Sequence, residues 1–315
     1  MASLVLDLQE VEGAAPDLVG AKALTLARLA GEGLPVPPFF AVSAAAFVLH
    51  LVENEIGWPR EARSVDPRTF SEVRERIREA PLPDAVRDPL MAAYERLCRE
   101  AGSDRVAVRS SGGEEDSPAA SFAGQFTSVL NVAGEAALVG ALKQCWASYL
   151  SEGSFRYRAS VGVPLGPTPA LGVIVQVQVL SQKAGVLFTR HPLEPDEDAS
   201  YIEANFGTGE SVVGGLVTPD SLTVSRSTRS VLEARIATKR RMTTPVSQAG
   251  GGGLVEVKDS EKESPVLTED EAHRLTEVGL RIESLLGVAQ DIEWAFDERG
   301  LWILQSRPLT AISRR

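Results

Sequence analysis

Apolar residues recur along this chain with two spacings, one typical of helices and the other typical of strands. An apolar stripe predicts a helix over 17–34. Glycines near its end and the prolines that follow prevent it from continuing. A second helix is expected over 44–56. Others are expected over 69–101, as two helices separated near Pro81 and Pro83, over 134–160 and over 268–287.

Runs rich in β-branched residues predict strands between these helices. They cover 105–109, 129–132, 171–179, 184–189, 200–204 and 220–225, and a hairpin is expected over 289–309. Helices and strands are mixed, with hairpins as well as crossovers, so the expected class is α+β (mixed α/β). A hinge near 176–190 would divide the chain into an N-terminal lobe, 1–180, and a C-terminal lobe, 181–315.

The last hairpin has one polar face. Side chains alternate along a strand, so Asp291, Glu293 and Ala295 share one side. A three-residue turn over 298–300, with glycine in the left-handed position, sets Glu293 opposite Gln305 and Asp291 opposite Arg307. A two-residue turn would split this set between the faces. The other face is expected to enter a core with Ile292, Trp294, Phe296, Trp302 and Leu304.

This polar set has the chemistry of a metal and phosphate site. Mg²⁺ takes one or two carboxylates and leaves its other positions to water and phosphates, so Asp291, Glu293 and Gln305 are candidate ligands. Arg307 beside them can bind phosphate oxygens as a fork. An ion pair between Asp291 and Arg307 on a solvated face explains the same pattern.

Two basic residues and two small-residue loops suggest an anion site. Arg109 ends a strand and leads into the loop 110–113, and a second such loop covers 119–125. Backbone N–H groups of such loops can approach phosphates closely. Lys22 lies in the first helical turn after Gly20, where the helix dipole favours an anion. Taken singly, such loops are more often plain turns and such lysines are usually solvated.

The phosphate-binding motifs of two other folds do not fit. The sequence has no Walker A motif, and Gly207-Thr208-Gly209 lacks the spacing of a dinucleotide-binding unit. The net charge of −11 argues against a nucleic-acid partner, which needs a basic surface. The two cysteines favour a reduced, cytoplasmic setting. The acidic N-terminus does not read as a secretory signal, and no apolar run reaches the ~18 residues of a membrane span.

Motifs in a fixed order along nearly the whole chain resemble one family. It is the N-terminal ATP-binding domain shared by phosphoenolpyruvate synthase, pyruvate phosphate dikinase and rifampicin phosphotransferase. The matching stretches are Val19-Gly-Ala-Lys22, Gly33-Leu-Pro-Val-Pro-Pro38, Val106-Ala-Val-Arg-Ser-Ser111, Ser121-Phe-Ala-Gly-Gln125, Gly185-Val-Leu-Phe-Thr189, Gly207-Thr-Gly-Glu210, Val217-Thr-Pro-Asp220, Gln290-Asp-Ile-Glu-Trp294 and Leu304-Gln-Ser-Arg-Pro308.

The resemblance implies an ATP-grasp fold, with ATP held in a cleft between the two lobes. It implies phosphate-binding, catalytic roles for Lys22, Arg109 and Arg307, and a loop at Gly124 that covers the phosphates. Ser128 would lie near the nucleotide and Gln176 at the adenine hinge. Glu293 and Gln305, with Asp291 nearby, would hold Mg²⁺. The implied cofactors are therefore ATP and Mg²⁺.

The resemblance also implies a partner. The family passes its phosphoryl group through a histidine on a separate swivelling domain, and neither His50, His191 nor His273 has that sequence context. A phosphohistidine domain or subunit is therefore expected in trans. AMP would be released, and the phosphoryl group would reach a small-molecule acceptor such as pyruvate or an antibiotic hydroxyl. A stand-alone kinase or ligase that acts without a histidine carrier, and a catalytically silent nucleotide-binding protein, remain as alternatives.

Overall fold

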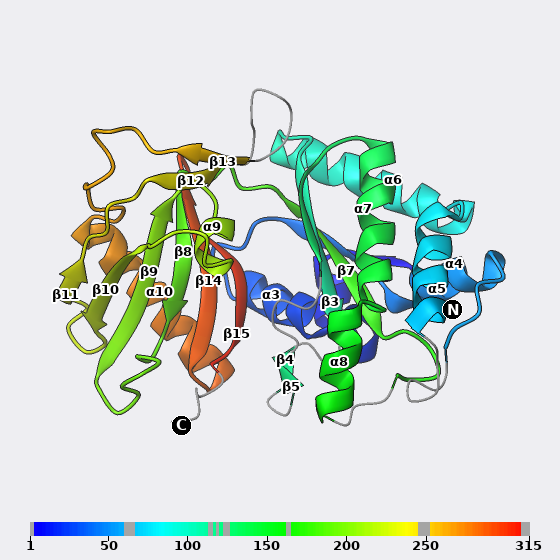
Figure 1. Cartoon of the computed structure of the whole chain (residues 1–315), viewed down its shortest axis with the longest axis horizontal. Helices are drawn as coiled ribbons and strands as arrows, with labels where there is room; N and C mark the ends of the chain where they lie inside the picture. The colour runs from blue at the N-terminus through cyan, green and yellow to red at the C-terminus, as the bar shows by residue number, and fades with distance from the viewer. Residues whose placement is uncertain are drawn as a thin grey trace. The chain divides into compact units, whose positions relative to one another are not determined.

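The chain folds into two compact units (Figure 1). The computed structural model describes residues 3–59, 67–112, 116–117, 120–121, 127–161, 165–244 and 253–309. Unit 1 contains Met1–Arg28 and Pro38–Gln178, and unit 2 contains Leu29–Pro37 and Val179–Arg315. Backbone contacts explain why Leu29–Pro37 groups with unit 2: Ile303 N donates to Pro35 O at 2.7 Å, and the Arg281 guanidinium donates to Glu32 O at 2.5 Å.

Unit 1 is built on a five-stranded antiparallel sheet. Its strand order is β1 (Val5–Leu6), β2 (Phe39–Val42), β7 (Leu171–Val177), β3 (Val106–Gly112) and β6 (Ser128–Val132). Its helices are α1 (Leu8–Glu12), α2 (Pro16–Val19), α3 (Ala21–Gly31, of which the last three residues belong to unit 2), α4 (Ala44–Glu53), α5 (Pro67–Glu79), α6 (Asp84–Ala101), α7 (Glu135–Ser148) and α8 (Glu152–Val161). A small pair, β4 (Asp116–Ser117) and β5 (Ala120–Ser121), completes the unit.

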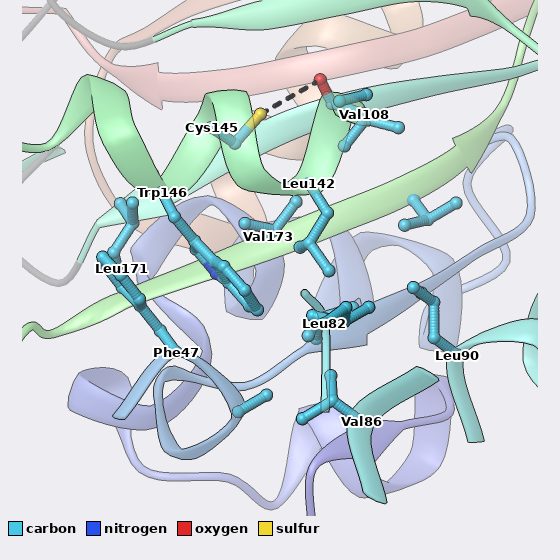
Figure 2. Close-up of a cluster of buried hydrophobic side chains, with 14 of the residues drawn as sticks. Phe47, Leu82, Val86, Leu90, Val108, Leu142, Cys145, Trp146, Leu171 and Val173 are labelled. Carbon is cyan, nitrogen blue, oxygen red and sulfur yellow. Dashed lines mark hydrogen bonds between the residues drawn. The ribbon is translucent and has the colours of Figure 1, made fainter. Parts of the chain in front are cut away.

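One face of this sheet forms the core of unit 1 (Figure 2). Alternate residues of β3 and β7, such as Val108 and Val173, pack against the helices on that face. Trp146 of α7 is fully buried and stacks on Phe47 of α4 with ring centroids 5.0 Å apart. The Cys145 thiol donates to Val108 O at 3.7 Å. Because this face is filled by side chains, a ligand site on the sheet must use the other face.

Unit 2 is built on a six-stranded antiparallel sheet. Its strand order is β11 (Val231–Arg235), β10 (Asp220–Ser225), β9 (Ala199–Phe206), β8 (Lys183–Phe188), β14 (Gln290–Asp297) and β15 (Gly300–Pro308). Helix α10 (Glu269–Leu286) packs on one face so closely that a methyl group on Gly279 would lie 2.3 Å from the Leu187 side chain. Helix α9 (Glu210–Val213) and the pair β12 (Arg241–Thr244) and β13 (Gly253–Glu256) complete the unit.

Most predicted elements are confirmed, and two long helices are not. The helix expected over 17–34 is broken into α2 and α3 at Gly20, whose φ of 84° is not helical. The helix expected over 134–160 is two helices, α7 and α8, separated at 149–151. Strands β1, β4, β5, β11, β12 and β13 were not expected. No helix among the described residues combines the length and the apolar character needed to cross a membrane.

Candidate functional site

The pairing of the last two strands is confirmed, but its predicted turn is wrong. Glu293 lies opposite Gln305 and Asp291 lies opposite Arg307, as expected. The turn holds only two residues, 298 and 299, since Asp297 pairs with Gly300. A bulge beside Glu293 takes up the extra residue on β15 and restores the register. The polar set therefore stays on one face although the turn is short.

The bulge also changes which residues enter the core. Ile292, Trp294 and Phe296 are buried as expected, and their partners are Leu301 and Ile303. Trp302 and Leu304, which were expected in this core, pack instead with Ala295 in a small apolar cluster that includes Val179 and Ala184. The prediction failed because a two-residue turn shifts β15 by one position between the turn and the bulge. The apolar cluster thus lies on the same side as the polar set.

Asp291 and Arg307 form a largely buried ion pair. Arg307 Nε and NH2 both donate to Asp291 Oδ2, at 2.9 and 2.7 Å. The Asp291 side chain is 11% exposed and that of Arg307 is 30% exposed. Burial raises the pKa of Asp291, while Arg307 acts to lower it and Glu293 to raise it. The pair is present as the simpler interpretation expected, but in a half-enclosed site rather than on a solvated face.

A third carboxylate faces the same side of the sheet. Val186 of β8 pairs with Glu293 on one side and with Glu203 of β9 on the other. Burial, and to a lesser extent the nearby Asp291 carboxylate, raises the pKa of Glu203. Sequence reasoning missed Glu203. Tyr201 and Glu203 alternate with buried residues on β9, and this pattern could have shown that both side chains share one face. It could not have shown that this face adjoins Glu293, because the order of the strands does not follow from local sequence.

Glu203, Asp291 and Arg307 border a cavity of about 920 Å³ in unit 2. It lies over β8–β11 and reaches Asp291 and Arg307 at one end. Phe188, His191, Tyr201, Glu203 and Arg235 are among its lining residues. The volume is within the usual range for small-molecule sites, about 300–1,000 Å³. Unit 2 by itself therefore holds a cavity with carboxylates and a guanidinium at its edge.

The predicted site residues of unit 1 gather on the sheet face opposite the core. Arg109 of β3 pairs with Ser128 on one side and Ile174 on the other, and Gln176 lies two pairs further along β7, opposite Ala107. Opposed residues of antiparallel strands share a face. Arg109, Ser128 and Gln176 thus lie on one face, with Gln176 2% exposed. Gly124 lies outside the described residues.

Lys22 is held against the end of β3. Its side chain is buried, with 5% of the residue exposed, and Nζ donates to Ser110 O at 3.1 Å. The next residue, Ala23, donates its backbone N–H to Ser111 Oγ at 3.1 Å. A Cβ on Gly20 would lie 2.1 Å from Ser111 O, so only glycine allows this approach. The backbone break at Gly20 therefore brings Lys22 to the strand that carries Arg109.

The donor set at the hairpin suits a magnesium ion that is completed by other ligands. Among the described residues, no group of three or more His, Cys, Asp or Glu side chains could hold a metal ion by itself. Glu293 and Gln305 offer one carboxylate and one amide oxygen from opposed positions. Mg²⁺ commonly takes one or two protein oxygens and completes its octahedron with water and phosphate. The residues therefore fit such an ion only with a phosphate ligand present.

Comparison with known proteins finds relatives along nearly the whole chain. The probable phosphoenolpyruvate synthase of Methanocaldococcus jannaschii is 36% identical to this chain. The match covers 98% of this chain and 27% of that protein. A rifampicin phosphotransferase from a Streptomyces species is 38% identical over 98% of this chain and 36% of its own length. The D-alanine-D-alanine ligase of Coxiella burnetii aligns with 93% of this chain and 48% of its own, at 10% identity and a TM-score of 0.36, which is too low to carry an argument.

The two antiparallel sheets with their helices form a chain of the α+β class, of the ATP-grasp type. The chain belongs to the pyruvate phosphate dikinase, AMP/ATP-binding domain family, whose model matches residues 16–315. The resemblance seen in the sequence motifs is thereby confirmed. The chain spans 27% and 36% of the length of the two relatives named above.

Proposed function

We propose that this chain is the ATP-binding and ATP-cleaving module of a phosphotransferase. The observation that carries the proposal is the cross-strand pairing of Glu293 with Gln305 and of Asp291 with Arg307 in a chain of this family. Phosphoryl transfer needs little covalent help from a protein. It depends on positioning and on neutralising charge at the phosphates, and these side chains supply both.

In unit 2, the hairpin would hold the phosphates of ATP. Arg307 is kept in one orientation by Asp291, so its fork can bind phosphate oxygens without first being ordered. Glu293 and Gln305 would hold Mg²⁺, which would supply positive charge beside the phosphates. The apolar cluster of Ala184, Ala295, Trp302 and Leu304 lies further along the same face and suits the adenine ring.

In unit 1, Lys22 and Arg109 would bind phosphate oxygens of ATP, with Ser128 and Gln176 nearer the nucleoside. The burial of Lys22 supports this role. Lys22 is 5% exposed and donates to a carbonyl, so burying its charge costs free energy. Contact with a bound anion would offset that cost. The loop at Gly124 is assigned here on the family resemblance alone, and the division into lobes over 1–180 and 181–315 rests on the expected hinge near 176–190.

By family analogy, the bond between the α and β phosphates is the one cleaved. AMP would leave, and a histidine on another domain or subunit would receive the diphosphate. The γ-phosphate would pass to water or phosphate, and the remaining phosphoryl group to pyruvate, an antibiotic hydroxyl or a similar small acceptor. Cys98 and Cys145 form no disulfide, which is consistent with the cytoplasmic setting included in this proposal.

The spent nucleotide tests this proposal. The chain would be incubated with ATP, Mg²⁺ and a lysate fraction or domain that carries the acceptor histidine, and nucleotides would be separated by chromatography. AMP is the expected product, and Arg109→Ala should abolish it while the far-ultraviolet circular dichroism stays unchanged. ADP would indicate a direct kinase or ligase instead. Tight ATP binding without turnover by any partner would indicate a silent nucleotide-binding protein.

A further inference from the structure

Another pocket of unit 2 is lined mainly by cations. It has a volume of about 490 Å³ and lies at the strand pair β12 and β13, at one end of the six-stranded sheet (Figure 1). The described residues that line it are Thr238, Arg240, Arg241, Glu256 and Lys262. Three of these side chains are cationic and one is anionic, in a chain whose net charge is −11. Among the described residues, this pocket shares none with the cavity that reaches Asp291 and Arg307.

Backbone hydrogen bonds hold the cations of this pocket together. Lys239 N donates to Lys262 O at 2.8 Å, and Val257 N donates to Arg240 O at 3.1 Å. Lys239 is itself anchored by its buried ion pair with Asp220. The turn that carries Lys262 is therefore fixed against the segment that carries Arg240. The pocket is part of the folded unit, and it does not depend on a chance meeting of long side chains.

The positive charge of the pocket is only partly compensated. Among the described residues, neither Arg240 nor Arg241 forms an ion pair, although Arg241 lies opposite Glu256 in the ladder. Lys262 Nζ donates to Asp259 Oδ1 at 2.6 Å, which raises the pKa of its ammonium group, whereas the charge of Arg240 acts to lower it. Like charges held in one pocket repel each other, and an anion between them would remove that repulsion.

The donors of the pocket suit an anion with several oxygens. A guanidinium is a planar fork that binds two oxygens of a phosphate or a carboxylate, and an ammonium group adds a compact charge. The Thr238 hydroxyl can donate a further hydrogen bond. The volume of about 490 Å³ is within the range of small-molecule sites, about 300–1,000 Å³. Two forks and a lysine in a concave site favour a small molecule with more than one negative charge.

We propose that this pocket binds a small oxyanion with two or three negative charges, either a phosphate compound or a polycarboxylate. Arg240 and Arg241 would bind its oxygens as forks, and Lys262 and Thr238 would complete the contacts. Glu256 would oppose the ligand and limit its affinity. The inference goes beyond the proposed function and does not rest on it, because none of these residues belongs to the set proposed to bind ATP. The bound anion would also link β12 to the turn at Lys262 and so stabilise unit 2.

Pyrophosphate and citrate are the probes for this pocket. Each would be titrated into the chain by calorimetry without magnesium, at an ionic strength held constant with sodium chloride. Arg240→Gln should raise the Kd about tenfold, as expected for loss of charge-assisted hydrogen bonds at an exposed site. Lys262→Met should act in the same direction. Arg109→Ala, which removes a proposed contact to ATP, should leave this binding event unchanged. The probe with the lower Kd identifies the ligand as a phosphate compound or a polycarboxylate.

Two further variants make the test specific. Glu256→Gln removes the opposing carboxylate and should lower the Kd about threefold, the opposite direction to Arg240→Gln. Lys258→Gln is the matched control, because Lys258 pairs with Glu261 and is absent from the described lining of the pocket. It should leave the Kd within about twofold.

Three results would overturn the inference. They are binding of neither probe, an unchanged Kd in Arg240→Gln, and a loss in Lys258→Gln as large as that in Arg240→Gln. The melting temperature of each variant without anion shows that the protein is folded, and both probes should raise the melting temperature of the unchanged chain. None of these results bears on ATP cleavage.

Discussion

Glu293 lies directly opposite Gln305 although the turn between their strands is one residue shorter than that pairing needs, because a bulge on β15 absorbs the difference. The pairing therefore depends on both the short turn and the bulge, and the alternation of residues along the strands shows neither of them. The pairing places one carboxylate directly opposite one amide. The two side chains can therefore be exchanged by mutation.

Exchanging this pair tests its role in metal binding. Glu293→Gln removes the carboxylate and should raise the Mg²⁺ concentration needed for half-maximal AMP formation by at least about tenfold, because Mg²⁺ strongly prefers carboxylate ligands. The double variant Glu293→Gln with Gln305→Glu returns one carboxylate to the opposite strand and should recover part of that loss. Unchanged magnesium dependence in Glu293→Gln would remove this residue from the proposed ligand set.

The ion pair of Asp291 with Arg307 predicts that lysine cannot replace the arginine. Arg307→Lys keeps the charge but loses the two-atom donation to Asp291 Oδ2, so the cation is no longer fixed. The rate of AMP formation should fall about a hundredfold, with the melting temperature changed by only a few degrees. Arg299→Lys, at the exposed turn of the same hairpin, is the control and should leave the rate unchanged.

The break at Gly20 should be sensitive to a single methyl group. Gly20→Ala places a Cβ at 2.1 Å from Ser111 O at a φ of 84°, so the backbone must move and Lys22 with it. ATP affinity should fall by at least about tenfold. Gly33→Ala is the matched control, because Gly33 also has positive φ, 72°, but its Cβ would meet nothing within 4 Å. It should cost about 1 kcal/mol of stability and leave ATP affinity intact.

Lys239 and Asp220 form a fully buried pair in unit 2, and removing one partner should be costly. Lys239 Nζ lies 2.6 Å from Asp220 Oδ1, and both side chains are 0% exposed. Asp220 also accepts the backbone N–H groups of Ala237 and Val266. Lys239→Met would leave a buried carboxylate without its cation and should lower the free energy of unfolding by about 3–5 kcal/mol.

Urea denaturation measures this difference, and the surface supplies the comparison. Lys262→Met breaks the pair with Asp259, whose side chain is 95% exposed, and should change the free energy of unfolding by less than about 1 kcal/mol. Equal effects of the two substitutions would show that the buried pair is no more important than an exposed one.

His50 should make the stability of unit 1 depend on pH. Burial lowers its pKa from the ordinary 6.5, and the ring is bonded to Ile77 O through Nε2 at 3.0 Å. As pH falls below about 6.5, the unfolded chain binds a proton that the folded ring resists, so the free energy of unfolding decreases. His50→Gln should flatten this dependence between pH 6.5 and lower values in urea titrations. His273→Gln, on the exposed face of α10, should leave it unaltered.

Much of this protein follows from local sequence patterns. The helices over 69–101 and 268–287 and most strands have periodicities that need no distant partner to be recognised. The motif order was specific enough to indicate the family, and the alternation around Asp291 and Glu293 placed both carboxylates on one face. These properties depend on neighbours a few residues away, so the linear sequence contains them.

Tertiary structure decided the rest. The turn is one residue shorter than expected, and the bulge holds the residue that the turn lacks. Only the packing of β14 against β15 fixes the position of that extra residue. Glu203 joins the site because β8 lies between β9 and β14, and Leu29–Pro37 joins unit 2 through bonds to residues more than two hundred positions away. Such contacts depend on strand order and chain return, which local periodicity does not encode.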